Sequence, residues 1–285
     1  MNSNKRTYNS SVLVGNWFED VALKDELTKD FLDRKEKGLL LTQQLKKILG
    51  GTDSDVHLSP CSSGHLKFGD RIQLLNAGSD PIAIQLNKAV PRKPTVVNIS
   101  VPPNVFQKKD DTSNIINVTA SQNLKPNSRN IFQIFSVDGT PNGQPVVYGQ
   151  PFQICSCNEE KYYLCCDTIQ LSETKHKSRH FQVVMSLFDH FNTHWKAEFY
   201  HPQMRLENEF TEIPVGKVVI LRHLKTNHAL ALEKDFASLT LFGNEYEIST
   251  QTYLNDHKAE MDVNYWIFGA SDQTDIEKCS KEHAD

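Results

Sequence analysis

The sequence lacks the features that usually mark membrane, secreted and nucleic-acid-binding proteins. It has no run of about 18 apolar residues, and its N-terminus has no apolar segment of the signal-peptide kind. Its 31 basic and 35 acidic residues nearly balance, and no stretch of lysine and arginine is dense enough for a nucleic-acid groove. We therefore expect a soluble, intracellular protein that has neither a membrane nor a nucleic acid as its partner.

The sequence also lacks the short motifs of common enzymatic chemistry. It has no glycine-rich phosphate loop, no His-Glu-x-x-His, no Gly-x-Ser-x-Gly and no Cys-x-x-Cys. His223 follows a predicted strand without a nucleophile beside it, so we interpret it as a hairpin-stabilising or surface residue. Asp189 and His190, like Asp256 and His257, fall in predicted loops with no positioned partner. We expect no catalytic residue, no cofactor-binding residue and no enzymatic activity.

Cysteine is too sparse, and too poorly placed, for a convincing metal site. The six cysteines are Cys61, Cys155, Cys157, Cys165, Cys166 and Cys279. In a reducing compartment we expect them to be thiols. Cys165 and Cys166 are adjacent in a predicted strand and point to opposite faces, so at most three thiols could converge. A structural zinc site needs four ligands, and even with His176 and His180 as candidates we expect no metal.

What the sequence does contain is a unit of four strands, clearest in residues 215–268. Alternating apolar residues mark strands that have one buried face, and a Lys-Thr-Asn turn at 225–227 joins the first two. The predicted strands of this unit are 218–221, the run from Leu230, 246–248 and 265–268.

The same unit occurs three times when the chain is aligned on Gly69, Gly149 and Gly216. The second strands then start at Ile82, Tyr163 and Leu230, and the third strands are 117–120, 181–185 and 246–248; the closing strands are 131–135, 195–199 and 266–268. Three units, each too small to bury its own apolar face, most simply close around a pseudo-threefold axis. The sequence thus predicts a mainly β protein, a β-trefoil of residues 64–270 with repeats of about 64–139, 145–201 and 213–270. A twelve-strand sandwich is the alternative.

Residues 1–51 precede the repeats and have the pattern of a helical arm. Leu23, Leu27 and Phe31 recur every four residues and form one apolar stripe, and Gly38 is expected to interrupt or end the helix. The stripe could pack on the trefoil or bind a partner. In the second case Trp17 and Phe18 would be anchors, since aromatic side chains carry much interface energy. These five apolar residues are our candidate partner contacts.

Two further segments break the repeat. Residues 87–114 of the first unit contain four prolines, which favours an exposed loop or extended arm in which 95–101 forms at most an edge strand. Long insertions are often functional, so this one is a candidate contact element. The polar tail, 271–285, is expected to be flexible.

The third unit resembles the MIR domain, the β-trefoil of protein mannosyltransferases and intracellular calcium-release channels. The residues that carry the resemblance are Leu221, Arg222, His223, Thr226, Asn227, Glu247, Ile248 and Trp266, with Asn227 in place of the usual glycine. The resemblance implies a trefoil fold, but the chain lacks the membrane enzyme or channel to which such domains are attached.

A more extensive resemblance, to the cilia- and flagella-associated protein 161 family, covers nearly the whole chain. It is carried by residues 15–17, 19–21, 29–32, 37–38, 148–150, 202–207 and 252–254, and by His257. It implies a non-enzymatic microtubule inner protein in the A-tubule lumen of axonemal doublets, with tubulin and neighbouring inner proteins as partners. The proline-rich insertion and the shorter tail depart from the family pattern. A lectin-like or phosphate-binding trefoil is the alternative, although no polar residues recur at matching pocket positions of the three units.

Overall fold

The computed structural model describes residues 17–43, 56–61, 63–76, 95–99, 115–157, 161–167, 177–240 and 242–270. The chain divides into two compact units, Met1–Gly51 and Thr52–Asp285. The expectations for the ends of the 1–51 arm, for the second strand at Ile82, for most of the 87–114 insertion and for the tail lie outside the described residues.

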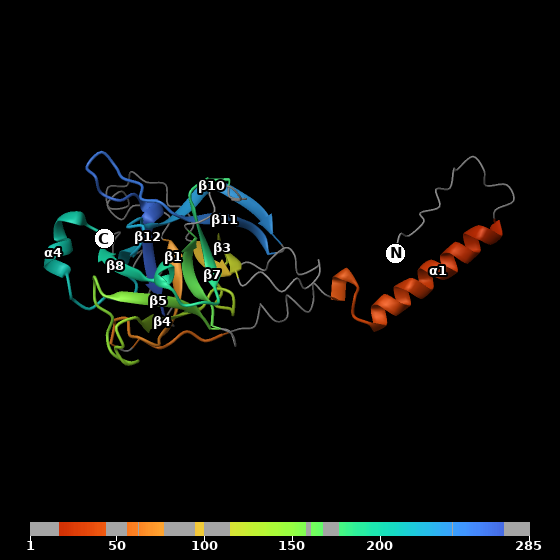
Figure 1. Ribbon diagram of the computed structural model, residues 1–285, viewed down its shortest axis with the longest axis horizontal. Helices are drawn as coiled ribbons and strands as arrows, with labels where there is room; N and C mark the ends of the chain where they lie inside the picture. The colour runs from red at the N-terminus through yellow and green to blue at the C-terminus, as the bar shows by residue number, and fades with distance from the viewer. Residues whose placement is uncertain are drawn as a thin grey trace, which may run out of the picture. The chain divides into compact units, whose positions relative to one another are not determined.

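The first unit contains helix α1, Trp17–Glu36 (Figure 1). Acidic residues in its first turn and basic residues in its last complement the helix dipole. Arg34 and Asp30, four residues apart, form an ion pair of 3.0 Å. Gly38 ends the helix, which confirms one of the two expectations for this residue. Its φ of +66° allows the N–H of Leu39 to donate to the carbonyl of Arg34, a Schellman arrangement.

The second unit, in its described residues, is built from twelve strands. They are β1 (Arg71–Asn76), β2 (Thr95–Ile99), β3 (Ile115–Ser121), β4 (Phe132–Ser136), β5 (Pro151–Ser156), β6 (Tyr163–Asp167), β7 (Phe181–Ser186), β8 (Trp195–Phe199), β9 (Val218–His223), β10 (Leu230–Thr240), β11 (Gly243–Thr250) and β12 (Tyr265–Gly269). Short helical turns lie between some of them: η3 (Phe191–Thr193), η4 (Pro202–Met204), α4 (Arg205–Asn208) and η5 (Asp262–Asn264).

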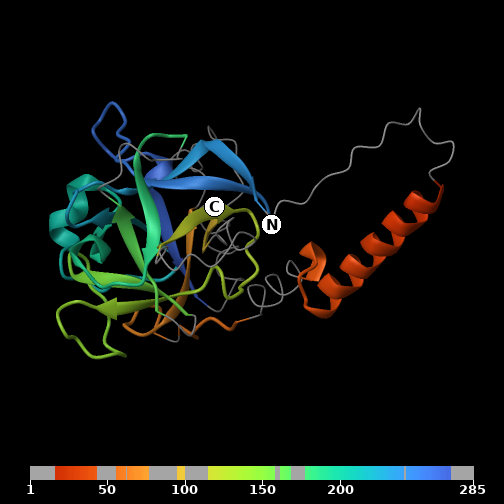
Figure 2. The same cartoon turned by 45° about the vertical axis from the view of Figure 1, so that its right-hand side comes forward.

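Six of these strands close into a barrel. Following the antiparallel pairs, β1 joins β4, β4 joins β5, β5 joins β8, β8 joins β9, β9 joins β12, and β12 returns to β1. The other six form the hairpins β2–β3, β6–β7 and β10–β11. The second strands of these hairpins, β3, β7 and β11, also pair with one another. A closed six-stranded barrel with a triplet of hairpins is a β-trefoil (Figures 1 and 2). The predicted fold is confirmed, and an open sandwich is excluded.

The glycines on which the units were aligned have a physical role. Gly69, Gly149 and Gly216 have φ of +89°, +83° and +78°, in the left-handed region that a Cβ disfavours. The N–H of each donates to a carbonyl of the closing strand of its own unit, at Ile134, Ala197 and Phe268 respectively. The three turns therefore have the same backbone conformation because each must start a barrel strand beside its closing strand.

Backbone hydrogen bonds also close a ring where the three units meet. The N–H of Leu66 donates to the carbonyl of Ile213, that of Ile213 to Val146, and that of Val146 to Leu66, at 2.8–2.9 Å. All three side chains are fully buried. The ring is threefold in its bonding although the three residue types differ, so the pseudo-symmetry belongs to the backbone.

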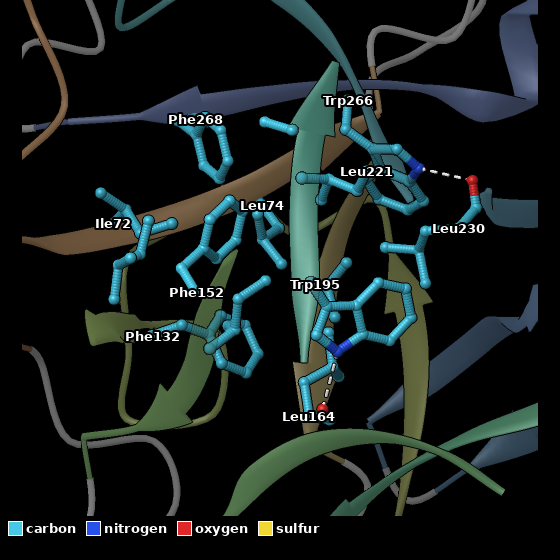
Figure 3. Close-up of a cluster of buried hydrophobic side chains, with 14 of the residues drawn as sticks. Ile72, Leu74, Phe132, Phe152, Leu164, Trp195, Leu221, Leu230, Trp266 and Phe268 are labelled. Carbon is cyan, nitrogen blue, oxygen red and sulfur yellow. Dashed lines mark hydrogen bonds between the residues drawn. The ribbon is translucent and has the colours of Figure 1, made fainter. Parts of the chain in front are cut away.

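The barrel interior is filled by large apolar side chains from all three units (Figure 3). Trp195 and Trp266 occupy equivalent closing strands, and their indole N–H groups donate to the carbonyls of Leu164 and Leu230 at 2.8 and 2.9 Å. Phe132 takes the corresponding place in the first unit and is also fully buried. The interpretation of these aromatic residues as core is confirmed.

The first unit differs from the sequence prediction at its second strand. Between β1 and β3 the structure has β2, Thr95–Ile99, inside the expected insertion. β2 pairs with β1 on one side and β3 on the other, so the expectation of at most an edge strand there is wrong. The prolines at 91, 94, 102 and 103 flank this strand without interrupting it. Val96 and Val97 are buried, which supplies the energetic reason for a strand at this point.

One buried polar atom of the barrel gives a testable prediction. Within the described residues the hydroxyl of Tyr148 has no hydrogen-bond partner, and burial raises its pKa to about 12. Replacing Tyr148 with phenylalanine removes an unsatisfied group and keeps the ring contact with Phe199. We expect Tyr148→Phe to raise the free energy of unfolding by about 1 kcal/mol in urea denaturation. Tyr163→Phe, at a more exposed ring, is the control; an unchanged or lower stability of Tyr148→Phe would contradict the prediction.

Candidate functional site

The candidate contact residues of the arm lie on α1. Leu23, Leu27 and Phe31 are 40, 59 and 51% exposed, as a partner-binding stripe requires. Helix α1 begins at Trp17, but the side chains of Trp17 and Phe18 lie outside the described part of the structure. The role of all five in partner contact stays a prediction. Val21 and Leu32 are exposed apolar residues on another side of the same helix, outside the predicted stripe.

The charged residues of the trefoil converge most closely in a four-membered ring of ion pairs, which we call the ion ring. Its members are Glu198 of β8, Arg205 of α4, Arg222 of β9 and Glu260 before η5. Arg222 bonds Glu198 at 2.8 Å and Glu260 at 2.7 Å. Arg205 bonds Glu260 at 2.6 Å and lies 3.5 Å from Glu198. Both arginines thus bridge both glutamates, and the ring joins four segments of the chain.

The chemistry of the ion ring is structural. Burial raises the pKa of Glu198, but hydrogen bonds from Lys196 and Arg222 and the charge of Arg222 outweigh it, so this pKa lies below its usual value. Glu198 is therefore held as a carboxylate. Arg205 also donates to the carbonyl of Phe199 at 3.0 Å, which fixes α4 against β8. Opposite charges paired at this depth hold the four backbone segments in place.

His223 is fully buried against the ring of Trp195, with 5.0 Å between the ring centroids. Its Nε2–H donates to the carbonyl of Asn192 at 3.0 Å, so Nδ1 accepts from the N–H and hydroxyl of Thr226. Nδ1 is therefore engaged within the β9–β10 turn, and Nε2 ties this turn to η3. The interpretation as a hairpin residue is confirmed, whereas the surface alternative is wrong. Asn227 follows at φ +56°, where an asparagine stands in for glycine.

A second buried carboxylate, Glu233 of β10, connects three parts of the hairpin region: β11, the residue before β7 and the segment that follows β11. It accepts from Tyr253 at 2.9 Å, contacts Nδ1 of His180 at 2.7 Å and accepts from the hydroxyl of Ser249. Burial and the adjacent carboxylate raise the pKa of Tyr253. The carboxylate is saturated by these partners, which is typical of a structural cluster.

Within the described ranges, the buried cysteines of β5 and β6 lie near Asp189 and His190. Asp189 accepts from Gln153, and His190 lies with Nε2 at 4.0 Å from the Sγ of Cys165. Burial raises the pKa of the Cys155 thiol to about 12, which disfavours the thiolate. No three His, Cys, Asp or Glu side chains in the described part of the chain are grouped to hold a metal. His176 and Cys279 lie outside it.

One feature was missed from sequence, a short exposed segment between β8 and β9. In η4, α4 and the turn that follows, Leu206 and Phe210 are 82 and 73% exposed. Phe210 also has φ of +64°, unusual for a bulky residue. The sequence holds only a weak signal for it, since Leu206 and Phe210 stand among glutamates outside any predicted strand and without a helical or strand period.

Among the described helices, none has the length and apolarity needed to cross a membrane.

Similarity to known proteins extends over most of the chain. The sequence model of the family described as "Cilia- and flagella-associated protein 161-like domain" matches residues 46–271. Proteins named cilia- and flagella-associated protein 161 are 33% identical in Danio rerio, over 93% of this chain and 89% of the relative, and 32% identical in Mus musculus, over 92% and 88%. The Bos taurus protein of that name is 30% identical over 91% and 81%.

Two solved structures are similar to this chain at low sequence identity. The SDF2-like protein from Arabidopsis thaliana aligns at a TM-score of 0.49 and 14% identity, over 72% of this chain and 94% of that one. A Caenorhabditis elegans protein of unknown function aligns at 0.49 and 12%, over 75% and 100%. At these scores the assignment of the fold rests on the strand pairing described above.

Proposed function

The chain belongs to the cilia- and flagella-associated protein 161 family, and from this membership we propose that it is a non-enzymatic microtubule inner protein of cilia and flagella. In this proposal it binds in the A-tubule lumen of doublet microtubules, stabilises the axoneme and supports ciliary motility. The observation that carries the proposal is the match to the family over residues 46–271. Its partners would be tubulin and neighbouring inner proteins.

The trefoil's polar chemistry supports a structural role. In the ion ring, at His223 and at Glu233, the buried polar side chains bond to other parts of the trefoil. A trefoil by itself implies no particular function, so the choice rests on these sites and on the family.

Helix α1 supplies the contact that we propose for the arm. An apolar stripe on an exposed helix can bind a groove on a partner through residues spaced by three and four. Leu23, Leu27 and Phe31 are spaced by four residues and are at least two-fifths exposed. Trp17 and Phe18, at the helix start, would add aromatic anchors.

We expect the triple variant Leu23→Gln, Leu27→Gln and Phe31→Gln to be lost from axonemes in cells that lack the wild-type protein. Glutamine keeps the helix propensity but removes apolar area, so the trefoil should fold normally while arm binding weakens at least about tenfold. The measurement is the fraction of tagged protein that stays with doublet microtubules after membrane and matrix extraction in salt.

The matched control is Asp25→Gln, Lys29→Gln and Glu36→Gln, three exposed residues on the opposite side of α1. This variant should be retained like the wild type. Equal retention of the stripe variant and the control would remove the arm from the proposal, whereas a wild-type protein that leaves the doublets in low salt would overturn the proposed function itself.

A further inference from the structure

We propose that the segment of residues 202–213 is a second docking surface, which binds a protein partner that presents basic side chains around an apolar recess. We call it the linker surface, defined by the exposed residues Met204, Leu206, Glu207, Glu209, Phe210 and Glu212. The inference rests on the proposed function, because its partner is sought in the doublet. It concerns a surface different from the arm.

The first observation is that Phe210 is exposed and strained at once. Its φ of +64° lies in the left-handed region, which costs free energy for any residue with a Cβ. Its N–H donates to the carbonyl of Tyr148 at 3.2 Å. In the preceding unit the corresponding bond, to the carbonyl of Phe68, comes from Gly143, at φ +91°. At both junctions this place takes a left-handed residue, and a glycine fills it in one while an exposed phenylalanine fills it in the other.

The second observation is that the surface is rigidly held from beneath. Arg205 lies between Met204 and Leu206, and its guanidinium belongs to the ion ring through Glu260 and Glu198. Within the segment, Asn208 donates to the carbonyl of Met204 at 2.8 Å, and Thr211 donates to that of Asn208 at 2.7 Å. Figure 1 shows α4 at the edge of the trefoil beside β8. A preorganised surface loses little conformational entropy on binding.

The third observation is charge, which identifies the kind of partner. Apart from Arg205, whose charge is neutralised in the ion ring, each ionisable residue from Met204 to Ile213 is a glutamate: Glu207, Glu209 and Glu212. Glu212 also lies 3.6 Å from the Nδ1 of His65. Apolar side chains set among carboxylates are complementary to a partner face on which lysine or arginine surrounds an apolar recess.

The test compares matched pairs of exposed side chains in the full-length protein. The linker variant is Leu206→Gln with Phe210→Gln. The control is Leu239→Gln with Phe188→Gln, whose side chains are 83 and 59% exposed elsewhere on the trefoil. Tagged forms are produced in cells that lack the wild type, and the fraction retained by extracted doublets is measured. We expect at least about tenfold lower retention of the linker variant, with the control like wild type.

Two further variants separate docking from folding and probe the partner's chemistry. Phe210→Gly relieves the strain, so the melting temperature of the purified protein should rise by about 2–4 °C while retention on doublets falls. Glu207→Gln with Glu209→Gln should make retention less dependent on salt, because fewer charges are then screened.

The outcomes are distinguishable. If the wild type stays on doublets and the linker variant stays equally well, the linker surface is not a contact and the proposed function stands. If Phe210→Gly stabilises the protein without loss of retention, the strained phenylalanine has no docking role and the proposal is likewise overturned. An unchanged salt dependence of the glutamine variant would overturn the basic partner. Absence of the wild type from doublets would overturn both proposals.

Discussion

Replacing Arg222 with methionine is expected to lower the free energy of unfolding by about 3 kcal/mol at neutral pH. The guanidinium is buried and bonds two carboxylates, Glu198 and Glu260, and the carbonyl of Asn227. Methionine fills much of the same volume but leaves Glu260, which is only 3% exposed, with Arg205 as its remaining partner in the ion ring. Because the buried carboxylate of Glu260 then loses one of its two arginine partners, we expect a large loss of stability from this single substitution.

Urea denaturation of the purified protein measures this loss, with Lys196→Met as the matched control. Lys196 also bonds Glu198, at 2.8 Å, but it is partly exposed and should contribute less than about 1 kcal/mol. Adding Glu260→Gln to the Arg222→Met variant removes the buried carboxylate that has lost one of its two arginine partners, so we expect it to restore part of the stability. If Arg222→Met and Lys196→Met cost the same, the ion ring does not stabilise the barrel.

Most of the trefoil could be predicted because its strands carry local signals. The sequence predicts the closing strand of the second unit at 195–199, and β8 spans Trp195–Phe199. An aromatic residue at or near the start of each closing strand fills the barrel. The residue types and the alternation of apolar side chains therefore both predict a strand at these positions. The positive φ at Gly69, Gly149 and Gly216 explains why an alignment on glycine finds the units at all.

The misplaced second strand has an equally physical cause. Prolines on both sides of β2 suggest a loop, but whether the strand forms depends on pairing with β1 and β3, which local sequence does not encode. The β10 strand is longer than its alternation indicates, since a register shift between Glu233 and Ala237 interrupts the pattern. Tertiary pairing overrides local preference in both cases.

The polar clusters were the least predictable part of the molecule. The arginine and histidine at 222 and 223 are recognisable as hairpin residues, but nothing near them in sequence points to Glu260 or Arg205 as partners. Long-range ion pairs follow from the barrel closing, after the strands are placed. The exposed Leu206 and Phe210 were missed for a different reason, because apolar residues in a linker give no periodic signal that would mark a surface.

His223 makes the stability of the trefoil depend on pH. Burial lowers its pKa to about 4, and the nearby Lys225, His194 and His228 act in the same direction, while the bond to Asn192 partly opposes them. The unfolded chain takes up this proton near its ordinary pKa of about 6.5. Because the unfolded state binds the proton first as pH falls, the contribution of His223 is fully present above about pH 6.5 and is lost between there and about pH 4.

We expect the free energy of unfolding to fall by about 2 kcal/mol between about pH 7 and about pH 5 through this one residue. Urea denaturation across that range measures it, and His223→Gln should flatten the pH dependence, since glutamine can still donate to Asn192 but does not titrate. The exposed His257→Gln is the control and should leave the pH dependence like that of the wild type. If His223→Gln keeps the full slope between those two pH values, the acid sensitivity belongs to other groups and the buried imidazole is not its origin.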